Sequence, residues 1–375
     1  MIEDAKIRWS EAGVECTARW RSESAVAPPQ HVIIADDEIT ADAAYRLACE
    51  GTALLWRGDF HNAKQLLQAL ARRVDRKKVK PATSPQDAFN QHRQAQAHRA
   101  RILGMVLIQF EIDCRINLRR APDVSQACAE AFGKVSEPFV ASLRELLGII
   151  GAHEWRKKGI DIPASDGRIH PHYGVFAPVR AEYVKLVNEA PLLSTTLAFD
   201  IGTGTGVLAA VLARRGVKKI IATDLDQRAL DCATENINGL GFEQQIEILK
   251  ADLFPPGRAP LIVCNPPWIP ARPSSALERA VYDPDSTMLR GFLNGLAEHL
   301  EPSGEGWLIL SDLAEHLGLR KRAELLDWID KAGLTVKQRL DMRPNHPRAT
   351  DTSDALHAAR AAEVTSLWRL IAQTD

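Results

Sequence analysis

The sequence predicts an α/β protein in two parts: a mostly helical N-terminal domain, residues 1–165, and a doubly wound, Rossmann-like domain, residues 166–375. Three observations lead to this prediction. Apolar residues recur at three- and four-residue spacing through the first part, as on amphipathic helices. From residue 197 onward, short apolar runs alternate with helical stretches, which is typical of a parallel sheet covered by helices on both faces. The first of these runs ends in a glycine-rich loop.

The helical pattern of the first part breaks into five segments separated by turn-forming residues. Thr40 is a candidate N-cap for the first helix, and Gly133 follows the fourth. A stretch with two prolines and small polar residues, 78–87, is predicted to be a linker. The expected helices cover residues 40–58, 62–78, 88–118, 124–132 and 138–150.

Composition excludes several classes of protein. The 45% apolar and 25% charged residues are typical of a globular chain with a core, and 375 residues suffice for two domains. The six cysteines include no CxxC pair, which argues against a zinc site or a disulfide framework and predicts a cytoplasmic protein. The N-terminus has no signal-peptide pattern, and the longest apolar run, 102–110, is too short to span a membrane.

Charge is distributed unevenly although the formal net charge is only -1. Between residues 71 and 120 the chain has twelve lysines and arginines against four acids. This stretch has two interpretations: a surface that contacts RNA or another polyanion, or a solvated face of exposed helices.

The alternating part predicts seven strands, most of them separated by helical patterns. Parallel strands in such a sheet end at one common edge, where open α/β sheets bind ligands. The expected strands cover 197–201, 219–224, 246–249, 261–265, 306–311, 334–340 and 364–371.

The glycine loop follows the first of these strands directly. Gly202, Gly204 and Gly206 have the spacing GxGxG, whereas a dinucleotide-binding fingerprint has GxGxxG. Asp200 stands two residues before the first glycine. Glycines at this place permit a tight turn and let a ligand approach the backbone at a helix N-terminus.

Two further acids follow the next two strands. Asp224 ends the second strand, where a carboxylate can accept hydrogen bonds from both hydroxyls of a ribose. Asp252 follows the third strand, where it can accept from an adenine amino group while Leu253 covers the ring. Each acid taken singly also fits a helix N-cap or a loop position. Three acids at the ends of successive strands favour a binding site.

The sequences DIGTGTG, TDLD, ADLF and NPPW, in this order, resemble the class I S-adenosylmethionine-dependent methyltransferases. The resemblance covers residues 172–340 and the strand 364–371, and NPPW places the chain near the HemK-like glutamine N5-methyltransferases and the methyltransferase small domain group. It implies S-adenosylmethionine as cofactor and a seven-stranded sheet of order 3-2-1-4-5-7-6. One departure is APVRAEY at 177–183, where the HemK-like proteins carry Pro-Arg-Pro-x-(Asp/Thr)-Glu.

In proteins of this kind the Asn-Pro-Pro-aromatic motif holds a planar nitrogen. The Asn265 side-chain oxygen and the Pro266 carbonyl would each accept one N–H, which orients the nitrogen lone pair toward the methyl group. Pro267 stiffens the turn, and Trp268 offers a flat face for an amide or a base. Asn265, Pro266, Pro267 and Trp268 are therefore the expected catalytic residues.

The resemblance also assigns the cofactor-binding residues. The segment before the first strand would cover the methionine end of the cofactor through an aromatic-x-Pro element. No metal is expected, because His346 and His357 in the 341–363 insertion lack the spacing of metal ligands. The expected cofactor-binding residues are Phe176, Pro178, Arg180, Asp200, Gly202, Thr203, Gly204, Gly206, Asp224, Leu225, Asp252, Leu253 and Asn265.

The acceptor is less well defined by the sequence than the cofactor. A protein glutamine side-chain amide is slightly favoured, because NPPWIP is closer to the glutamine group, and the N-terminal domain would then recognise a protein. An exocyclic amino group of RNA or DNA, adenine N6 or guanine N2, is the alternative that the basic stretch favours. A third alternative is a cofactor-binding interaction module without catalysis, although Asn265 and both prolines are intact. The expected partner is thus a macromolecule, and no membrane is involved.

Overall fold

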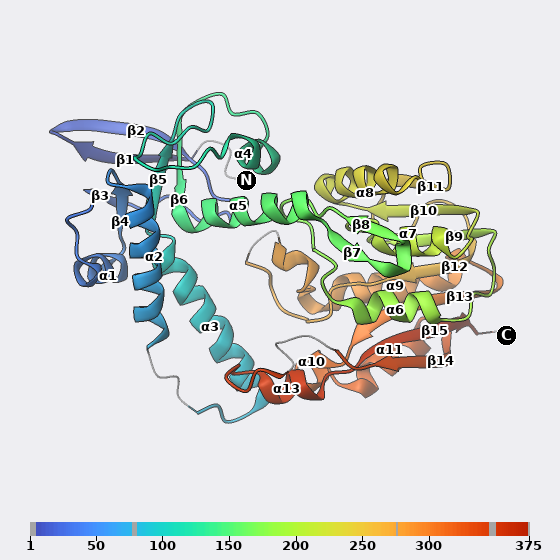
Figure 1. The fold of residues 1–375 in the computed structure, drawn as a ribbon. Helices are drawn as coiled ribbons and strands as arrows, with labels where there is room; N and C mark the ends of the chain where they lie inside the picture. Colours follow the sequence, from blue (N-terminus) through green and yellow to red (C-terminus); the bar gives the residue numbers. More distant parts are fainter. Residues whose placement is uncertain (1–4, 77–80, 275–276, 345–349, 374–375) are drawn as a thin grey trace. The chain divides into compact units, whose positions relative to one another are not determined.

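The computed structural model describes residues 5–76, 81–274, 277–344 and 350–373, and each of its two compact units has a sheet of its own (Figure 1). The first unit consists of residues 1–83 and 90–154, and the second of residues 84–89 and 155–375. The predicted linker 78–87 lies partly outside the described residues, and Pro85 is already the first residue of a helix. In the described ranges no helix is long and apolar enough to cross a membrane.

The first unit is built on a six-stranded sheet of order β1-β2-β6-β5-β4-β3. The β2–β6, β3–β4 and β4–β5 pairs are parallel, and the β1–β2 and β5–β6 pairs are antiparallel. Its strands are β1 (Lys6–Glu11), β2 (Val14–Trp20), β3 (His31–Ala35), β4 (Thr52–Trp56), β5 (Val106–Phe110) and β6 (Phe139–Ser142).

The prediction of a mostly helical first domain misses the six-stranded sheet at its centre. The predicted helix 40–58 ends at Gly51, whose φ of 90° is favourable for glycine, and the chain continues into the buried strand β4. The predicted helix 88–118 ends at Leu103, two residues before β5. Helices are nevertheless present where the periodicity is longest: α1 (Ala41–Glu50, N-cap Thr40), α2 (Phe60–Asp75), α3 (Pro85–Leu103), α4 (Ser125–Phe132) and α5 (Leu143–Lys158).

The second unit contains a seven-stranded sheet of order β11-β10-β9-β12-β13-β15-β14, the predicted 3-2-1-4-5-7-6. All seven predicted strands are present, and β15 is antiparallel to both of its neighbours. They are β9 (Leu197–Ile201), β10 (Lys219–Asp224), β11 (Ile246–Lys250), β12 (Ala259–Cys264), β13 (Leu300–Ser311), β14 (Leu334–Met342) and β15 (Thr365–Ala372); a short hairpin of β7 (Ile160–Ile162) and β8 (Gly167–Ile169) precedes them.

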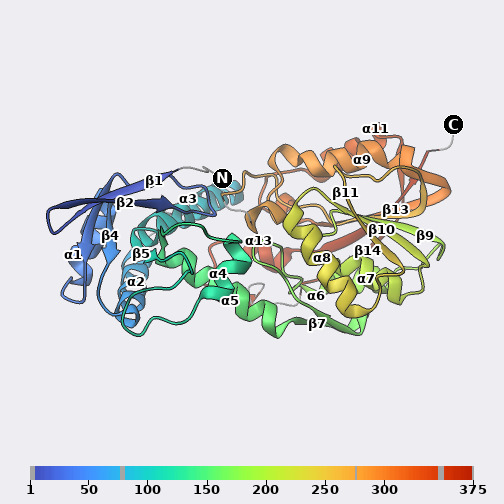
Figure 2. The same ribbon diagram turned by 90° about the horizontal axis from the view of Figure 1, so that it is seen from above.

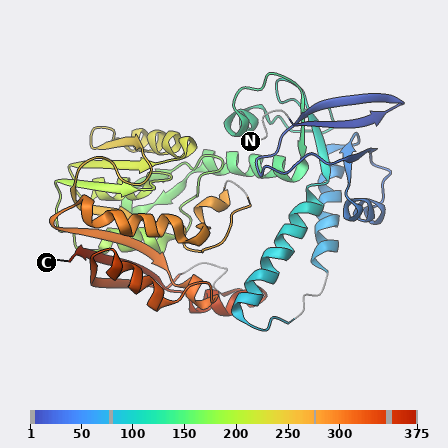
Figure 3. The same cartoon turned by 180° about the vertical axis from the view of Figure 1, so that it is seen from behind.

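Helices cover both faces of this sheet, as a doubly wound fold requires. One apolar core joins α6, α7 and α8 to one face, and a second joins α9 and α11 to the other. Figure 2 shows α7 and α8 on the side opposite α9 and α11, and Figure 3 shows α9 against the strands from behind. The helices are α6 (Ala181–Glu189), α7 (Val207–Arg214), α8 (Gln227–Leu240), α9 (Thr287–His299), α10 (Leu313–His316), α11 (Arg322–Lys331) and α13 (His357–Ala362).

The basic stretch 71–120 is partly neutralised within the first unit. Lys77, Lys78 and Lys80 lie outside the described residues. Five of its arginines lie within ion-pair distance of an acid, and Asp59, whose side chain is fully buried, accepts from two of them. The pairs are Arg73–Asp42, Arg99–Asp75, Arg115–Asp113, Arg119–Asp59 and Arg120–Asp59. Contact of this stretch with RNA therefore stays a prediction. The ion pairs neutralise part of the positive charge that the sequence implies.

One carboxyl of the first unit leads to a stability prediction. Burial raises the pKa of Glu145 to about 7, although a hydrogen bond from the Glu23 backbone N–H lowers it. Between the ordinary glutamate pKa and about 7 the folded state therefore binds more protons than the unfolded chain. The free energy of unfolding then falls as pH rises through this window, because the buried group must ionise.

Glu145→Gln is expected to stabilise the protein at pH 8 by roughly 2 kcal/mol and to have little effect at pH 4.5. Glutamine keeps an acceptor for the Glu23 N–H but carries no charge to bury. Urea unfolding at both pH values measures the difference, with Glu38→Gln, at an exposed position, as the control. Equal effects of Glu145→Gln at the two pH values would contradict the prediction.

Candidate functional site

The glycine loop lies between β9 and α7, at the carboxyl edge of the sheet. Gly202, Gly204 and Gly206 all have positive φ, of 71°, 56° and 81°. A Cβ at Gly202 would lie 2.5 Å from Met288 Cε, the end of a flexible side chain, so the positive φ is the stronger reason for glycine there, whereas a Cβ at Gly204 would meet no atom within 4 Å. Open space over Gly204 leaves the backbone accessible to a ligand.

Asp200 is buried below this loop and organises it. One carboxylate oxygen accepts from Thr203 Oγ1 at 2.7 Å and from the Ala209 backbone N–H at 3.1 Å. Burial raises the pKa of Asp200 to about 6, although these two hydrogen bonds lower it. Thr203 is buried as well, so both side chains shape the loop from within.

Asp224 joins the end of β10 to the glycine loop. Its Oδ2 accepts from the Gly204 N–H at 3.0 Å and its Oδ1 from the Asp226 N–H at 3.0 Å. A carboxylate has about four acceptor positions, so two remain for a ligand. Burial raises the pKa of Asp224, and the backbone donors counteract this shift. Leu225 beside it is 62% exposed, which is an unusual position for a large apolar side chain.

The third strand end brings Asp252 and Leu253 to the same edge. Asp252 is exposed, and Leu253 has a left-handed φ of 68°. Thr223 Oγ1 donates to the Leu253 carbonyl at 2.6 Å, which ties this turn to β10. The predicted adenine-binding residues are thus adjacent to the strand of the predicted ribose acceptor.

Asn265, Pro266, Pro267 and Trp268 follow β12, the neighbour of β9 on the other side. The Trp268 indole Nε1–H donates to Asn265 Oδ1 at 2.8 Å. Trp268 is partly buried and packs against three apolar clusters, so its ring has a fixed orientation. The hydrogen bond therefore fixes the Asn265 amide, and Oδ1 retains a second lone pair for another donor.

The segment before α6 contributes a side chain to the same site. The Arg180 guanidinium lies over the Trp268 ring, 4.7 Å from its centroid. It is also paired with Glu182 and with Glu363, the latter at 2.9 Å. Pro178 is buried and Phe176 is partly buried. Arg180 thus contacts the Asn-Pro-Pro-Trp motif, a position that its predicted role in cofactor binding does not specify.

Sequence reasoning missed four residues that support the site. Asp283 accepts from the Met288 and Leu289 N–H groups and caps α9. Glu363, two residues before β15, accepts from Arg180 and from Ser311 at the end of β13. Asn236 on α8 donates to the Thr205 carbonyl at 3.0 Å and accepts from the His170 N–H at 2.7 Å. No motif marks these positions, and the partners of Glu363 and Asn236 are distant in the sequence.

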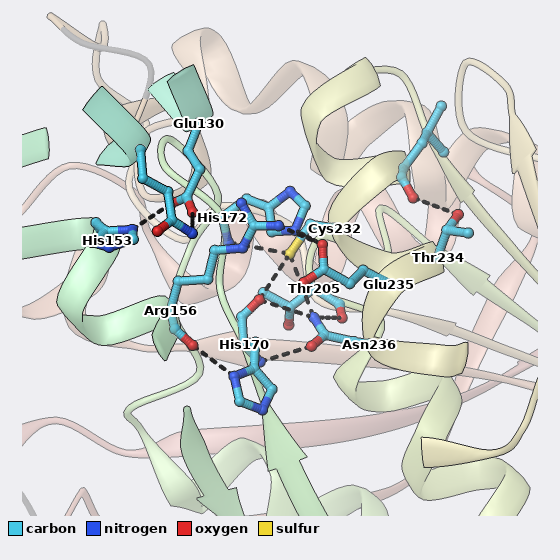
Figure 4. Close-up of polar contacts among 12 residues, drawn as sticks. Glu130, His153, Arg156, His170, His172, Thr205, Cys232, Thr234, Glu235 and Asn236 are labelled. Atoms are coloured by element: carbon cyan, nitrogen blue, oxygen red, sulfur yellow. Dashed lines mark hydrogen bonds and ion pairs between the residues drawn. The ribbon is translucent and has the colours of Figure 1, made fainter. Parts of the chain in front are cut away.

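The close-up in Figure 4 shows how Asn236 joins the glycine loop to the segment after β8. Cys232 Sγ lies one turn earlier on α8 and donates to the His170 carbonyl at 3.6 Å. Glu235, on the same helix, accepts from His172 Nε2 at 2.8 Å. Burial raises the pKa of Cys232 to about 12, so this thiol stays protonated and is a structural group. Within the described ranges no group of three or more His, Cys, Asp or Glu could hold a metal.

The sequence of this chain is similar to those of known methyltransferases. A release factor glutamine methyltransferase from Cereibacter sphaeroides is 33% identical over 178 residues, 44% of this chain and 63% of that protein. A tRNA1(Val) (adenine(37)-N6)-methyltransferase from Tolumonas auensis is 33% identical over 206 residues, 52% of this chain and 83% of that protein.

The chain belongs to the class I S-adenosylmethionine-dependent methyltransferases.

The family described as ribosomal protein L11 methyltransferase (PrmA) matches residues 185–282 of this chain. The chain spans 63% of the length of the Cereibacter relative. It spans 57% of the length of a tRNA1(Val) (adenine(37)-N6)-methyltransferase from Shewanella halifaxensis. A solved ribosomal protein L11 methylase from Lactobacillus delbrueckii subsp. bulgaricus has a TM-score of 0.39 and 18% identity over 56% of this chain and 87% of that one. The seven-stranded order itself establishes the fold.

Proposed function

We propose that the protein is an S-adenosylmethionine-dependent N-methyltransferase that acts on a planar nitrogen. One observation carries this proposal: the Trp268 indole fixes the Asn265 amide at the carboxyl end of β12, directly beside the strand that leads into the glycine loop. A planar nitrogen is a poor nucleophile, because its lone pair is delocalised. Methyl transfer to it therefore depends on orientation, which Asn265 and the rigid proline turn supply.

The residues at the strand ends fit the cofactor. Asp224 has two acceptor positions left for a ribose, and the exposed Leu225 and the turn at Leu253 offer apolar cover for an adenine ring. The glycine loop leaves open space over Gly204 for the methionine end. When bound, S-adenosylmethionine supplies an electrophilic methyl group on a sulfonium, whose C–S bond breaks as the N–C bond forms.

The chain's own residues orient the acceptor. Asn265 Oδ1 accepts one N–H of the acceptor nitrogen with the lone pair that Trp268 does not use. The Pro266 carbonyl accepts the other N–H, so the nitrogen lone pair faces the methyl group. After transfer the nitrogen is acidic and loses its extra proton to solvent, so no strong general base is needed.

An exocyclic amino group of a nucleobase, adenine N6 first, is the acceptor that we propose. The Tolumonas relative is matched over 83% of its length, and its name specifies adenine N6. The first unit is built on a sheet, so it gives no support to the helical protein-docking domain expected for a glutamine substrate. A protein glutamine amide is the second candidate, which the Ile-Pro after the motif and the Cereibacter relative favour.

Methylation of an extract decides between the two acceptors. Purified protein and labelled S-adenosylmethionine are incubated with lysate from cells that lack the gene, and the product is treated with nuclease or protease. Label released by nuclease and found in a methylated adenine would support the first candidate. Label released by protease and found in methylglutamine would establish the second. The absence of any label above an Asn265→Ala control would overturn the proposed activity.

Cofactor affinity is expected to fall several-fold between pH 7 and pH 5. Burial raises the pKa of Asp200 to about 6, so this carboxyl becomes protonated as pH falls through that value. Only the ionised form attracts the cationic cofactor beside the loop, and binding at low pH must first remove the proton. Calorimetry at pH 5, 6, 7 and 8 measures the effect, and Asp200→Asn should flatten the profile. An identical pH profile in that variant would contradict this role.

A further inference from the structure

Glu363, two residues before β15, has a position that no catalytic motif explains. Its side chain is fully buried, and its Oε1 accepts from Arg180 Nη2 at 2.9 Å and from Ser311 Oγ at 2.6 Å. Ser311 in turn accepts from the Leu313 N–H at 3.0 Å through the same Oγ. The carboxylate is thus anchored to the carboxyl end of β13, at the ligand edge of the sheet.

A continuous series of contacts joins this carboxylate to the acceptor motif. Glu363 holds Arg180, and the Arg180 guanidinium lies over the Trp268 ring at 4.7 Å. The Trp268 indole donates to Asn265 Oδ1 at 2.8 Å. All of these residues belong to the second unit. The orientation of the Asn265 amide therefore depends, through three contacts, on a residue 98 positions later in the chain.

The cost of this arrangement argues against a purely stabilising role. Glu363 Oε2 is buried without a hydrogen-bond partner among the described residues. A buried carboxylate with an unpaired oxygen is expensive, and a neutral or apolar residue in its place is often no less stable. Arg180 already has Glu182 as a counter-ion, so its charge alone does not require a second acid. The second acid fixes the direction of the guanidinium.

We propose that Glu363 is a positioning residue for methyl transfer, acting through Arg180 and Trp268 on the Asn265 amide. The expected effect on kcat rests on the proposed N-methyltransferase function, whereas the structural part of the proposal does not. The link between Glu363 and Trp268 is a property of the structure and is measurable without catalysis.

The kinetic test compares Glu363→Gln, Arg180→Met and the double variant. Glu363→Gln keeps the shape and an acceptor oxygen but loses the charge that directs Arg180. We expect its kcat to fall about 10- to 100-fold, because misplacement of about 1 Å can cost 100-fold, with KM for cofactor unchanged within twofold. The double variant should lose no more than Arg180→Met alone, since both changes remove one interaction. If the fall in kcat of the double variant equalled the product of the falls in the two single variants, the proposal would be overturned.

The second test observes the indole directly in protein labelled with ¹⁵N-tryptophan. Trp268→Phe assigns the Trp268 Nε1–H resonance, and Glu363→Gln is expected to shift it. Glu305→Gln is the matched control: Glu305 is also buried and paired with an arginine, Arg369, but it accepts from the Trp307 indole at 3.1 Å. That control should shift the Trp307 resonance and leave Trp268 in place.

The two tests separate the proposal from the proposed function. A Trp268 resonance unmoved by Glu363→Gln would overturn the positioning role, whatever the activity. A shifted resonance in a protein that methylates no nitrogen would overturn the proposed function and support the link from Glu363 to Trp268. A shift together with the fall in kcat would support both.

Discussion

Replacing Asn265 with alanine is expected to lower turnover about 100- to 1000-fold while cofactor affinity changes less than twofold. The magnitude is typical of removing one oriented hydrogen-bonding group at a reacting centre. Asn265 is only partly exposed after β12, and its Oδ1 already accepts from Trp268, so the side chain has one orientation before substrate arrives. Calorimetry with S-adenosylhomocysteine and single-turnover assays on the acceptor measure the two quantities separately.

Trp268→Phe is the matched control for this prediction. Phenylalanine keeps an aromatic face and most of the packing, but it cannot donate to Asn265 Oδ1. If the indole hydrogen bond only restricts the amide, turnover should fall by about tenfold, clearly less than in Asn265→Ala. A turnover near that of the wild type in Asn265→Ala would show that orientation by this amide is not the basis of catalysis. Weakened cofactor binding in the same variant would assign Asn265 to the cofactor instead.

The second unit could be predicted closely because its central strands β9 and β12 are almost fully buried. β12 is almost entirely apolar and β13 contains the apolar run Trp307–Leu310, the pattern that central parallel strands share, and helical segments separate most of the runs. Glycine and acid positions then follow from the strand ends, since parallel strands end at one edge. The order of the sheet came from the resemblance and is confirmed by the observed pairing.

The first unit could not be predicted in the same way, because its strands are short and border helices without a break in polarity. β4 is a five-residue strand with four apolar residues that follows α1 after one residue, and β5 follows α3 after two residues. Short apolar runs of this length fit a buried strand and a buried helical turn equally well. Gly51 was the available signal, since a glycine after a periodic segment is a helix stop.

The site residues also differ in whether the sequence could indicate them. Those within motifs, such as Asp224 and Asn265, could be proposed from the sequence because their type and spacing suit the chemistry, and their roles stay predictions. Glu363 and Asn236 could not be found, because they act on residues 183 and 31 positions away, Arg180 and Thr205. Tertiary structure alone places such partners, and an isolated acid or amide in the sequence does not indicate them.

Replacing Asp224 with alanine is expected to weaken cofactor affinity about 100-fold, or ~3 kcal/mol, with a smaller effect on turnover at saturating cofactor. The carboxylate has two tasks. It would accept from the ribose with its remaining lone pairs, and it already accepts from the Gly204 and Asp226 N–H groups. Alanine removes both the ligand contact and the link from β10 to the glycine loop.

Two further variants separate these tasks. Asp224→Asn keeps one oxygen for Gly204 or a ribose hydroxyl but loses the charge, so an intermediate loss of affinity is expected. Asp226→Ala removes the neighbouring acid, which caps α8 through the Arg228 N–H at 2.9 Å, and should cost about 1 kcal/mol of stability without weakening cofactor binding. Calorimetry with S-adenosylhomocysteine ranks the three variants. If Asp226→Ala weakened binding as much as Asp224→Ala, the ribose assignment would be wrong, and the order of the whole β10–α8 turn would determine affinity.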